Sequence, residues 1–244
     1  MKKYLKYIVP FVLIVIGVIY YNNFAFVGFY NHIKIDAKEI VSDSGHEQTV
    51  RLNHQLTRLK QLNSLALNVE YNDDLKDLEK LSKLEKLTLI PIDETARSGF
   101  DLKSLPQVSS LKHLILCSFT KEDIDCSSIG NLNNLESITV MDSNIWDWSF
   151  VGKLNNLTQV RIVMLHDYNK FKWDGLSLSN SIEVFDATLI YYDKTLLESL
   201  KSISSLKRIN ISFSDYDKLN HEDKIYIEEW ISEIKNKNIE VTVE

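Results

Sequence analysis

The sequence predicts an α/β solenoid of about seven repeats. Three observations support this fold class. The same apolar spacing returns seven times after residue 50, only 7 Gly and 3 Pro interrupt 244 residues, and 44% apolar with 25% charged residues is ordinary globular composition. So few turn-forming residues argue against a many-turned β-sandwich and against glycine-rich phosphate loops.

Each repeat places an apolar residue at every third position and then two apolar residues at every second position. In the first copy these are Leu56, Leu59, Leu62, Leu65 and Leu67. The three-residue spacing predicts one apolar stripe on a helical or 3₁₀ segment, and the two-residue spacing predicts a short strand. The strand pairs begin at residues 65, 87, 114, 138, 160, 185 and 209, the copy at 185 being degenerate. One copy cannot bury its stripe, but stacked copies bury each other's.

Residues 1–30 differ from the rest of the chain. Lys2, Lys3 and Lys6 precede an uncharged apolar run from residue 7 to 21, and aromatic residues flank it. With those flanks the segment approaches the ~20 residues of a membrane-spanning helix. A cleaved signal peptide is the alternative, but it needs small residues at the cleavage site, and Asn23, Phe24 and Phe26 occupy those positions. We therefore expect an uncleaved, single-pass anchor in the cell membrane.

The charge distribution predicts the orientation of the chain and excludes one class of partner. Lysines before the span predict a cytoplasmic N-terminus and an extracytoplasmic body. That body holds 25 Lys and Arg against 34 Asp and Glu. An acidic body is a poor nucleic-acid binder, since binding phosphates takes clustered basic residues. Membrane contact is thus expected through the N-terminal helix alone.

Two further segments are expected to cap the solenoid, which divides the chain into four parts. Residues 31–55, with Ile33, Ile35, Val50 and Leu52 as strand candidates, precede the repeats of residues 56–215. In residues 216–244 the pattern predicts a helix that begins after Asn220 and carries Ile227, Trp230, Ile231 and Ile234 on one side. An edge strand with Ile239, Val241 and Val243 is expected to follow it. We interpret Trp230 as part of the core of this cap.

The repeat pattern resembles the leucine-rich repeat family and, more closely, bacterial surface proteins of the internalin type. The closer resemblance rests on an Asp ahead of the stripe in four copies, Asp74, Asp101, Asp125 and Asp147. A carboxylate there can accept hydrogen bonds from free amides at a helix start, so we interpret these residues as structural caps and not as metal ligands. The chain departs from the family at the asparagine that follows the strand, where Glu70, Ile92, Phe119, Ser143, Leu165, Ile190 and Ser214 stand; Asn144 comes one position late.

No sequence motif supports catalysis. The phosphate-loop, nucleophile-elbow and zinc-protease patterns are absent, and the six His have no ligand spacing. His166, Asp167 and Cys117 are the only candidates for an enzymatic site, so we expect no enzyme, no cofactor and no metal. Cys126 is interpreted as core, and a disulfide between Cys117 and Cys126 stays open.

The candidate binding residues flank the inward leucines of the strands, on the concave face of the predicted solenoid. They are Thr88, Ile90, Ile115, Thr139, Met141, Arg161, Val163, Asp186 and Asn210. Ile90, Cys117, Met141 and Val163 make an unusually apolar column, which indicates either a binding patch or a surface covered by a loop. The aromatic stretch His166, Tyr168, Phe171 and Trp173 is a second candidate, or else fills a gap left by the degenerate repeat.

These observations predict a bacterial, membrane-anchored repeat protein whose extracytoplasmic solenoid binds another protein. Repeats supply a surface and no reaction, so the partner is not identified by the fold. Within this class an adhesin-like surface protein, a toxin-neutralising protein of the immunity type and a subunit of an envelope complex stay open. The alternatives outside it are a secreted repeat protein and a purely structural envelope protein.

Overall fold

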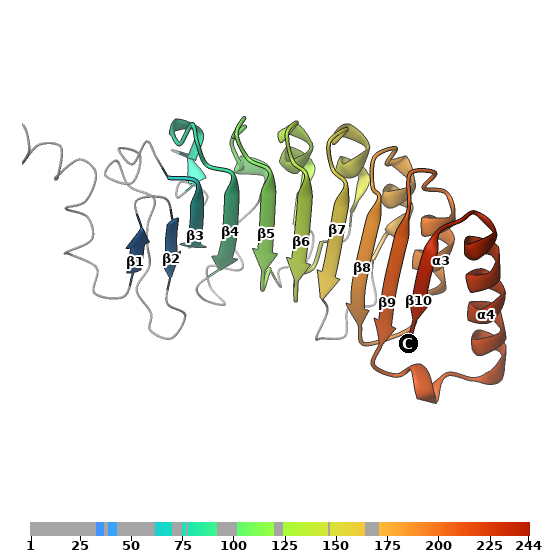
Figure 1. The fold of residues 1–244 in the computed structure, drawn as a ribbon. Helices are drawn as coiled ribbons and strands as arrows, with labels where there is room; N and C mark the ends of the chain where they lie inside the picture. Colours follow the sequence, from blue (N-terminus) through green and yellow to red (C-terminus); the bar gives the residue numbers. More distant parts are fainter. Residues whose placement is uncertain are drawn as a thin grey trace, which may run out of the picture.

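Ten strands form one sheet in which the order in space follows the order in the sequence. The computed structural model describes residues 33–36, 39–42, 62–69, 75–76, 78–91, 102–119, 124–145, 147–163 and 171–244. Figure 1 shows the strands as a single row from β1 to β10. Such a sequential order is what stacked repeats produce, because each copy contacts only its neighbours.

All neighbouring strands are parallel except the first two. β1 and β2 form an antiparallel hairpin, and β2 then pairs in parallel with β3. The strands are β1 (Ile33–Asp36), β2 (Glu39–Ser42), β3 (Ser64–Val69), β4 (Lys86–Pro91), β5 (His113–Cys117), β6 (Ser137–Met141), β7 (Gln159–Val163), β8 (Val184–Leu189), β9 (Arg208–Phe213) and β10 (Glu240–Val243). All seven predicted strand pairs fall within β3–β9, which confirms the α/β solenoid.

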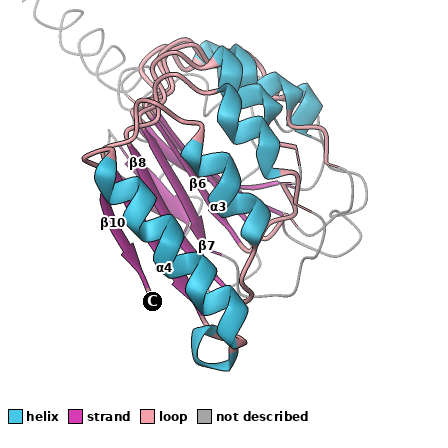
Figure 2. Cartoon of the chain, turned by 90° about the vertical axis from the view of Figure 1, so that its right-hand side faces the viewer, coloured by secondary structure: helices cyan, strands magenta, loops and turns pink. Residues whose placement is uncertain are grey.

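In the part of the chain that the structure describes, short helices cover one face of the sheet and no helix covers the other (Figure 2). Five of them are 3₁₀ helices and the last copy forms an α-helix, and the three-residue spacing predicted a segment of either kind. They are η4 (Leu78–Lys80), η5 (Leu102–Ser104), η6 (Ser127–Asn131), η7 (Ser149–Lys153), η8 (Trp173–Leu178) and α3 (Lys194–Lys201), followed by η9 (Tyr216–Lys218) and α4 (His221–Asn236). We call the uncovered side the open face of the sheet.

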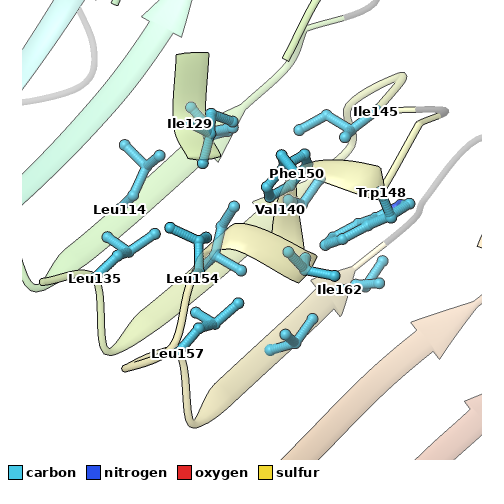
Figure 3. Close-up of a cluster of buried hydrophobic side chains, with 14 of the residues drawn as sticks. Leu114, Ile129, Leu135, Val140, Ile145, Trp148, Phe150, Leu154, Leu157 and Ile162 are labelled. Atoms are coloured by element: carbon cyan, nitrogen blue, oxygen red, sulfur yellow. The ribbon is translucent and has the colours of Figure 1, made fainter. Parts of the chain in front are cut away.

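The core lies between the sheet and the helical layer and runs along the whole solenoid. Figure 3 shows one section, in which Leu114 and Val140 from the strands meet Ile129 and Leu154 from the helical side. All four are at most 1% exposed. The degenerate copy contributes Ile182, Phe185 and Ala187, which are buried like their counterparts.

Side chains in the turns before the strands form hydrogen bonds between consecutive copies. The hydroxyl of Ser110 donates to the Leu84 carbonyl at 2.8 Å, and Ser205 donates to the Ile182 carbonyl at 2.7 Å. Asn134, Asn156 and Ser181 make the equivalent bonds to the preceding copy. Each copy from the third to the seventh is thus tied to the one before it by a bond from the residue just before a buried leucine or isoleucine. The apolar pattern did not reveal this column of polar residues.

The predicted aspartate caps are confirmed where the structure describes them. One Asp125 carboxylate oxygen accepts from the Ser127 amide at 2.9 Å, and Asp147 accepts from the Ser149 amide at 2.8 Å. Hydrogen bonds from the Ser127 side chain and, to a smaller extent, from the Ser127 amide lower the pKa of Asp125. Asp74 and Asp101 lie outside the described residues.

The C-terminal segment closes the core as expected. Asn220 accepts from the Asp223 amide at 2.8 Å and so caps α4. Trp230 is 1% exposed, and its indole N–H donates to the Leu197 carbonyl at 2.8 Å. After Asn238, which has a φ of 60°, the chain reverses into β10 at the edge of the sheet.

The predicted anchor, residues 1–30, lies outside the described residues, as do Val50 and Leu52 of the N-terminal cap; Ile33 and Ile35 lie in β1. Among the helices that the structure describes, none has the length and apolar character needed to cross a membrane.

Candidate functional site

The nine candidate residues lie on six adjacent strands and face the open side of the sheet. Thr88, Ile115, Thr139, Arg161, Asp186 and Asn210 are successive register partners from β4 to β9. Each alternates with buried leucine, isoleucine, valine or similar core residues, so the side chains point away from the helices. The structure therefore brings these six into one row; their role in binding stays a prediction.

A second row carries the apolar surface. Cys117, Met141 and Val163 are register partners on β5, β6 and β7. Met141 is 40% exposed, whereas Ile90, Ile115, Cys117 and Val163 are partly buried. The side chains of one sheet face pack against each other, which lowers the exposure of each. We call these three residues, Cys117, Met141 and Val163, the apolar ridge; Met141 is its most exposed member.

Cys117 is the member of this ridge on β5, and its thiol is weakly nucleophilic. Its thiol lies 3.9 Å from the Met141 sulfur, and burial raises the pKa of the thiol. A raised pKa lowers the thiolate fraction at neutral pH, and the thiolate is the reactive form. Both Cys117 and Cys126 are free thiols, and Cys126 is buried as expected.

A polar hollow of about 220 Å³ continues the open face beyond the apolar ridge. Arg161, Asp186 and Asn210 contribute to its lining, and the Asn210 amide donates to an Asp186 carboxylate oxygen at 2.7 Å. Thr188 and Ser212 add hydroxyl groups, and Thr242 and Glu244 close it at the edge. The candidate residues missed Thr242 and Glu244, although their alternation with Val241 and Val243 predicts the same face.

The aromatic stretch is partly a core feature. Trp173 is 1% exposed, stacks on Phe171 at 4.8 Å between ring centroids, and donates from its indole to an Asp193 oxygen at 2.6 Å. It also stacks on Trp148 at 6.1 Å. The sequence left open whether this stretch binds a partner or fills a gap beside the degenerate repeat. For Trp173 the structure supports the second interpretation, because its side chain is buried. His166, Asp167 and Tyr168 lie outside the described residues.

Within the described ranges, no three His, Cys, Asp or Glu side chains come together as a metal site would require. His113 is engaged with the Ser137 hydroxyl at 2.9 Å. The expectation that the chain is not an enzyme stays a prediction.

Comparison with known proteins returns similarity in structure alone. No protein-family model matches the chain, and no curated protein matches it. An internalin (inlF) from Listeria monocytogenes is 20% identical with a TM-score of 0.40 over 78% of this chain and 49% of its own. The chain thus spans about half the length of that protein. Internalin C2 from the same species is 18% identical with a TM-score of 0.45, over 84% of this chain and 80% of its own. The repeat architecture itself rests on the strand register and on the recurring buried positions of this chain.

Proposed function

We propose that the chain is a protein-binding repeat module whose open sheet face contacts the partner. The observation that carries this proposal is the apolar ridge of Cys117, Met141 and Val163, which crosses three adjacent strands beside a polar hollow. Protein interfaces combine an apolar centre with a polar rim in this way. Met141 supplies a flexible, polarisable side chain that adapts to a partner surface.

We further propose that residues 1–30 anchor the module in the cell membrane, with the N-terminus in the cytoplasm and the repeats outside. The support is the basic cluster, the apolar run and the lack of a small-residue cleavage site in the sequence. The alternative is a secreted form from which a signal peptide has been cleaved. The mass of the mature protein distinguishes the two, because only the anchored form keeps residues 1–30. A neutraliser of a secreted toxin and an envelope-complex subunit both fit a small single-anchor protein.

The test is a crosslinking pull-down from native membranes with the full-length protein. The test variant replaces Met141 and Val163 of the ridge, and Ile115 in the neighbouring row on β5, with Glu, which puts three negative charges on and beside the ridge. The control variant replaces exposed turn residues with Glu, namely Asn133, Asn155 and Ser204. Both variants add three negative charges to the chain, so a difference between them reports the position of the charges.

We expect a partner that wild type and control recover and the ridge variant loses. Circular dichroism and the thermal midpoint of both variants establish that the fold is intact. Equal recovery from all three proteins contradicts a binding role of the ridge. Recovery of only abundant membrane neighbours by wild type favours a purely structural envelope protein.

A further inference from the structure

The outer edge of β10 lies at the end of the sheet, three strands away from the ridge. β10 is the last strand of the sheet and pairs on one side with β9. Among the described residues, no strand pairs with its other side. Figure 2 views the molecule from this end and shows β10 at the near edge, with α4 beside it.

The hydrogen bonds of β10 identify which backbone groups face outward. The Glu240 amide donates to the Lys207 carbonyl at 2.9 Å, and the Glu244 amide donates to the Ile211 carbonyl at 3.0 Å. The Glu244 carbonyl accepts from the Phe213 amide at 2.7 Å. In a parallel ladder, alternate residues bond to the same neighbour, so the N–H and C=O groups of Val241 and Val243 point to the outer edge. Such a row is a template for one more strand.

The side chains along this edge are acidic on the open face and apolar on the other. Glu240, Thr242 and Glu244 are exposed, whereas Val241 is buried and Val243 is partly buried against the core. Arg208 is the register partner of Glu240. Glu244 lines the polar hollow, where Asp186 adds a second carboxylate and Arg161 the one cation among the lining residues.

The surrounding segment strengthens the negative charge. Residues 221–244 hold seven Asp and Glu against three Lys. Two of these lysines are engaged, Lys237 with Glu233 at 3.6 Å and Lys224 with the Asp217 carbonyl at 3.1 Å. An edge of this charge attracts a basic segment and repels an acidic one.

The same charges disfavour a second copy of the chain as the occupant. An antiparallel pair of β10 strands centred on Thr242 would place Glu240 of each copy opposite Glu244 of the other. Like charges directly opposite each other destabilise a strand pair. Acidic edge residues of this kind keep sheets from joining edge to edge.

We propose that the outer edge of β10 takes up an extended basic segment of a partner protein as an eleventh strand. Its backbone pairs with Val241 and Val243. Its basic side chains, at every second position, face Glu240 and Glu244 on the open side. The apolar side chains between them cover Val243 on the core side.

The test uses the full-length protein in detergent and a fluorescent nine-residue peptide that alternates Lys with Val. The same peptide with Glu in place of Lys is the control, and sedimentation measures the oligomeric state of both peptides and of the protein. We expect wild type to bind the Lys peptide about tenfold more tightly than the Glu peptide, from two opposite-charge pairs replacing two like-charge pairs.

Two variants locate the binding. The double substitution Glu240→Lys and Glu244→Lys should reverse the preference between the peptides. Val243→Pro removes an outward N–H that β9 does not use and should abolish binding; the charge-reversal variant decides alone if this one fails to fold. Equal binding of both peptides by wild type, or an unchanged preference after charge reversal, overturns the proposal. A wild-type dimer that Glu240→Lys alters would assign the edge to a second copy and also overturn it.

Discussion

Asp193 joins two consecutive repeats, and its replacement by Ala should cost more stability than replacement of the exposed Asp174. One carboxylate oxygen of Asp193 caps α3: it accepts from the Thr195 amide at 2.8 Å and from the Leu196 amide at 3.4 Å. The same oxygen accepts from the Thr195 hydroxyl. The other accepts from the buried Trp173 indole at 2.6 Å. The side chain thus stabilises a helix start and satisfies a donor in the preceding copy.

The magnitude follows from these two roles. Loss of an N-cap costs about 1 kcal/mol. A buried N–H left without a partner costs about 1–3 kcal/mol, and Trp173 is 1% exposed. We therefore expect Asp193→Ala to lower the free energy of unfolding by about 2–4 kcal/mol. Asp193→Asn keeps one acceptor oxygen and turns an N–H toward the other donor group, so it should lose roughly half as much.

The assay is urea unfolding of the full-length protein, followed by tryptophan fluorescence and far-ultraviolet circular dichroism. Asp174→Ala removes an exposed carboxylate from η8 and is the control, with an expected change within about 0.5 kcal/mol. An Asp193→Ala variant no less stable than this control would refute the reasoning. Wild-type stability of Asp193→Asn would refute the role of the second oxygen.

Three further predictions concern the packing of the helical layer and two titrating groups. Gly175→Ala should destabilise by about 1–3 kcal/mol, because a Cβ there would meet the backbone of Trp148 at 2.5 Å. A Cβ at Gly152 would meet the Leu178 Cβ at 2.9 Å and the Leu178 carbonyl oxygen at 3.6 Å, so Gly152→Ala should cost less; urea midpoints compare the two. Burial, with smaller effects of nearby carboxylates, raises the pKa of Tyr192 to about 12. The unfolded chain therefore ionises first above pH ~10, and stability should fall as the pH rises from there toward 12, less steeply in Tyr192→Phe; unfolding midpoints over this range test it. Alkylation of Cys117 by iodoacetamide at pH 8 should be slower than that of free cysteine, since burial raises the pKa of its thiol; equal rates, followed by mass spectrometry, would contradict this.

The repeat architecture was predictable because it depends on a periodic pattern of apolar residues. Leu65, Leu114 and Val160 each start a predicted strand pair and lie in β3, β5 and β7. Their burial follows from stacking alone, so no knowledge of the partner copy was needed. Asn220 and Trp230 were likewise assigned correctly, since helix caps and amphipathic spacing are local signals.

The features that sequence analysis left open depend on contacts between residues far apart in the chain. The bond from Trp173 to Asp193 spans two copies, and no spacing rule connects them. Position 175 requires glycine because the backbone at the start of η7 lies too close to leave room for a Cβ. The apolar pattern within one repeat does not indicate this contact with the preceding copy. How far each ridge side chain is exposed could also not be read from the sequence: Cys117 and Val163 are partly buried among their neighbours, whereas Met141 is 40% exposed.

The central claim is that the open face contacts a partner protein, and a photo-crosslinking amino acid at position 141 tests it most directly. The matched position is Asn155, an exposed turn residue away from the open face. In native membranes, the protein labelled at position 141 should give an adduct of defined mass that the protein labelled at 155 does not. An adduct from position 155 alone, or none from 141 where the pull-down recovers a partner, would contradict the account.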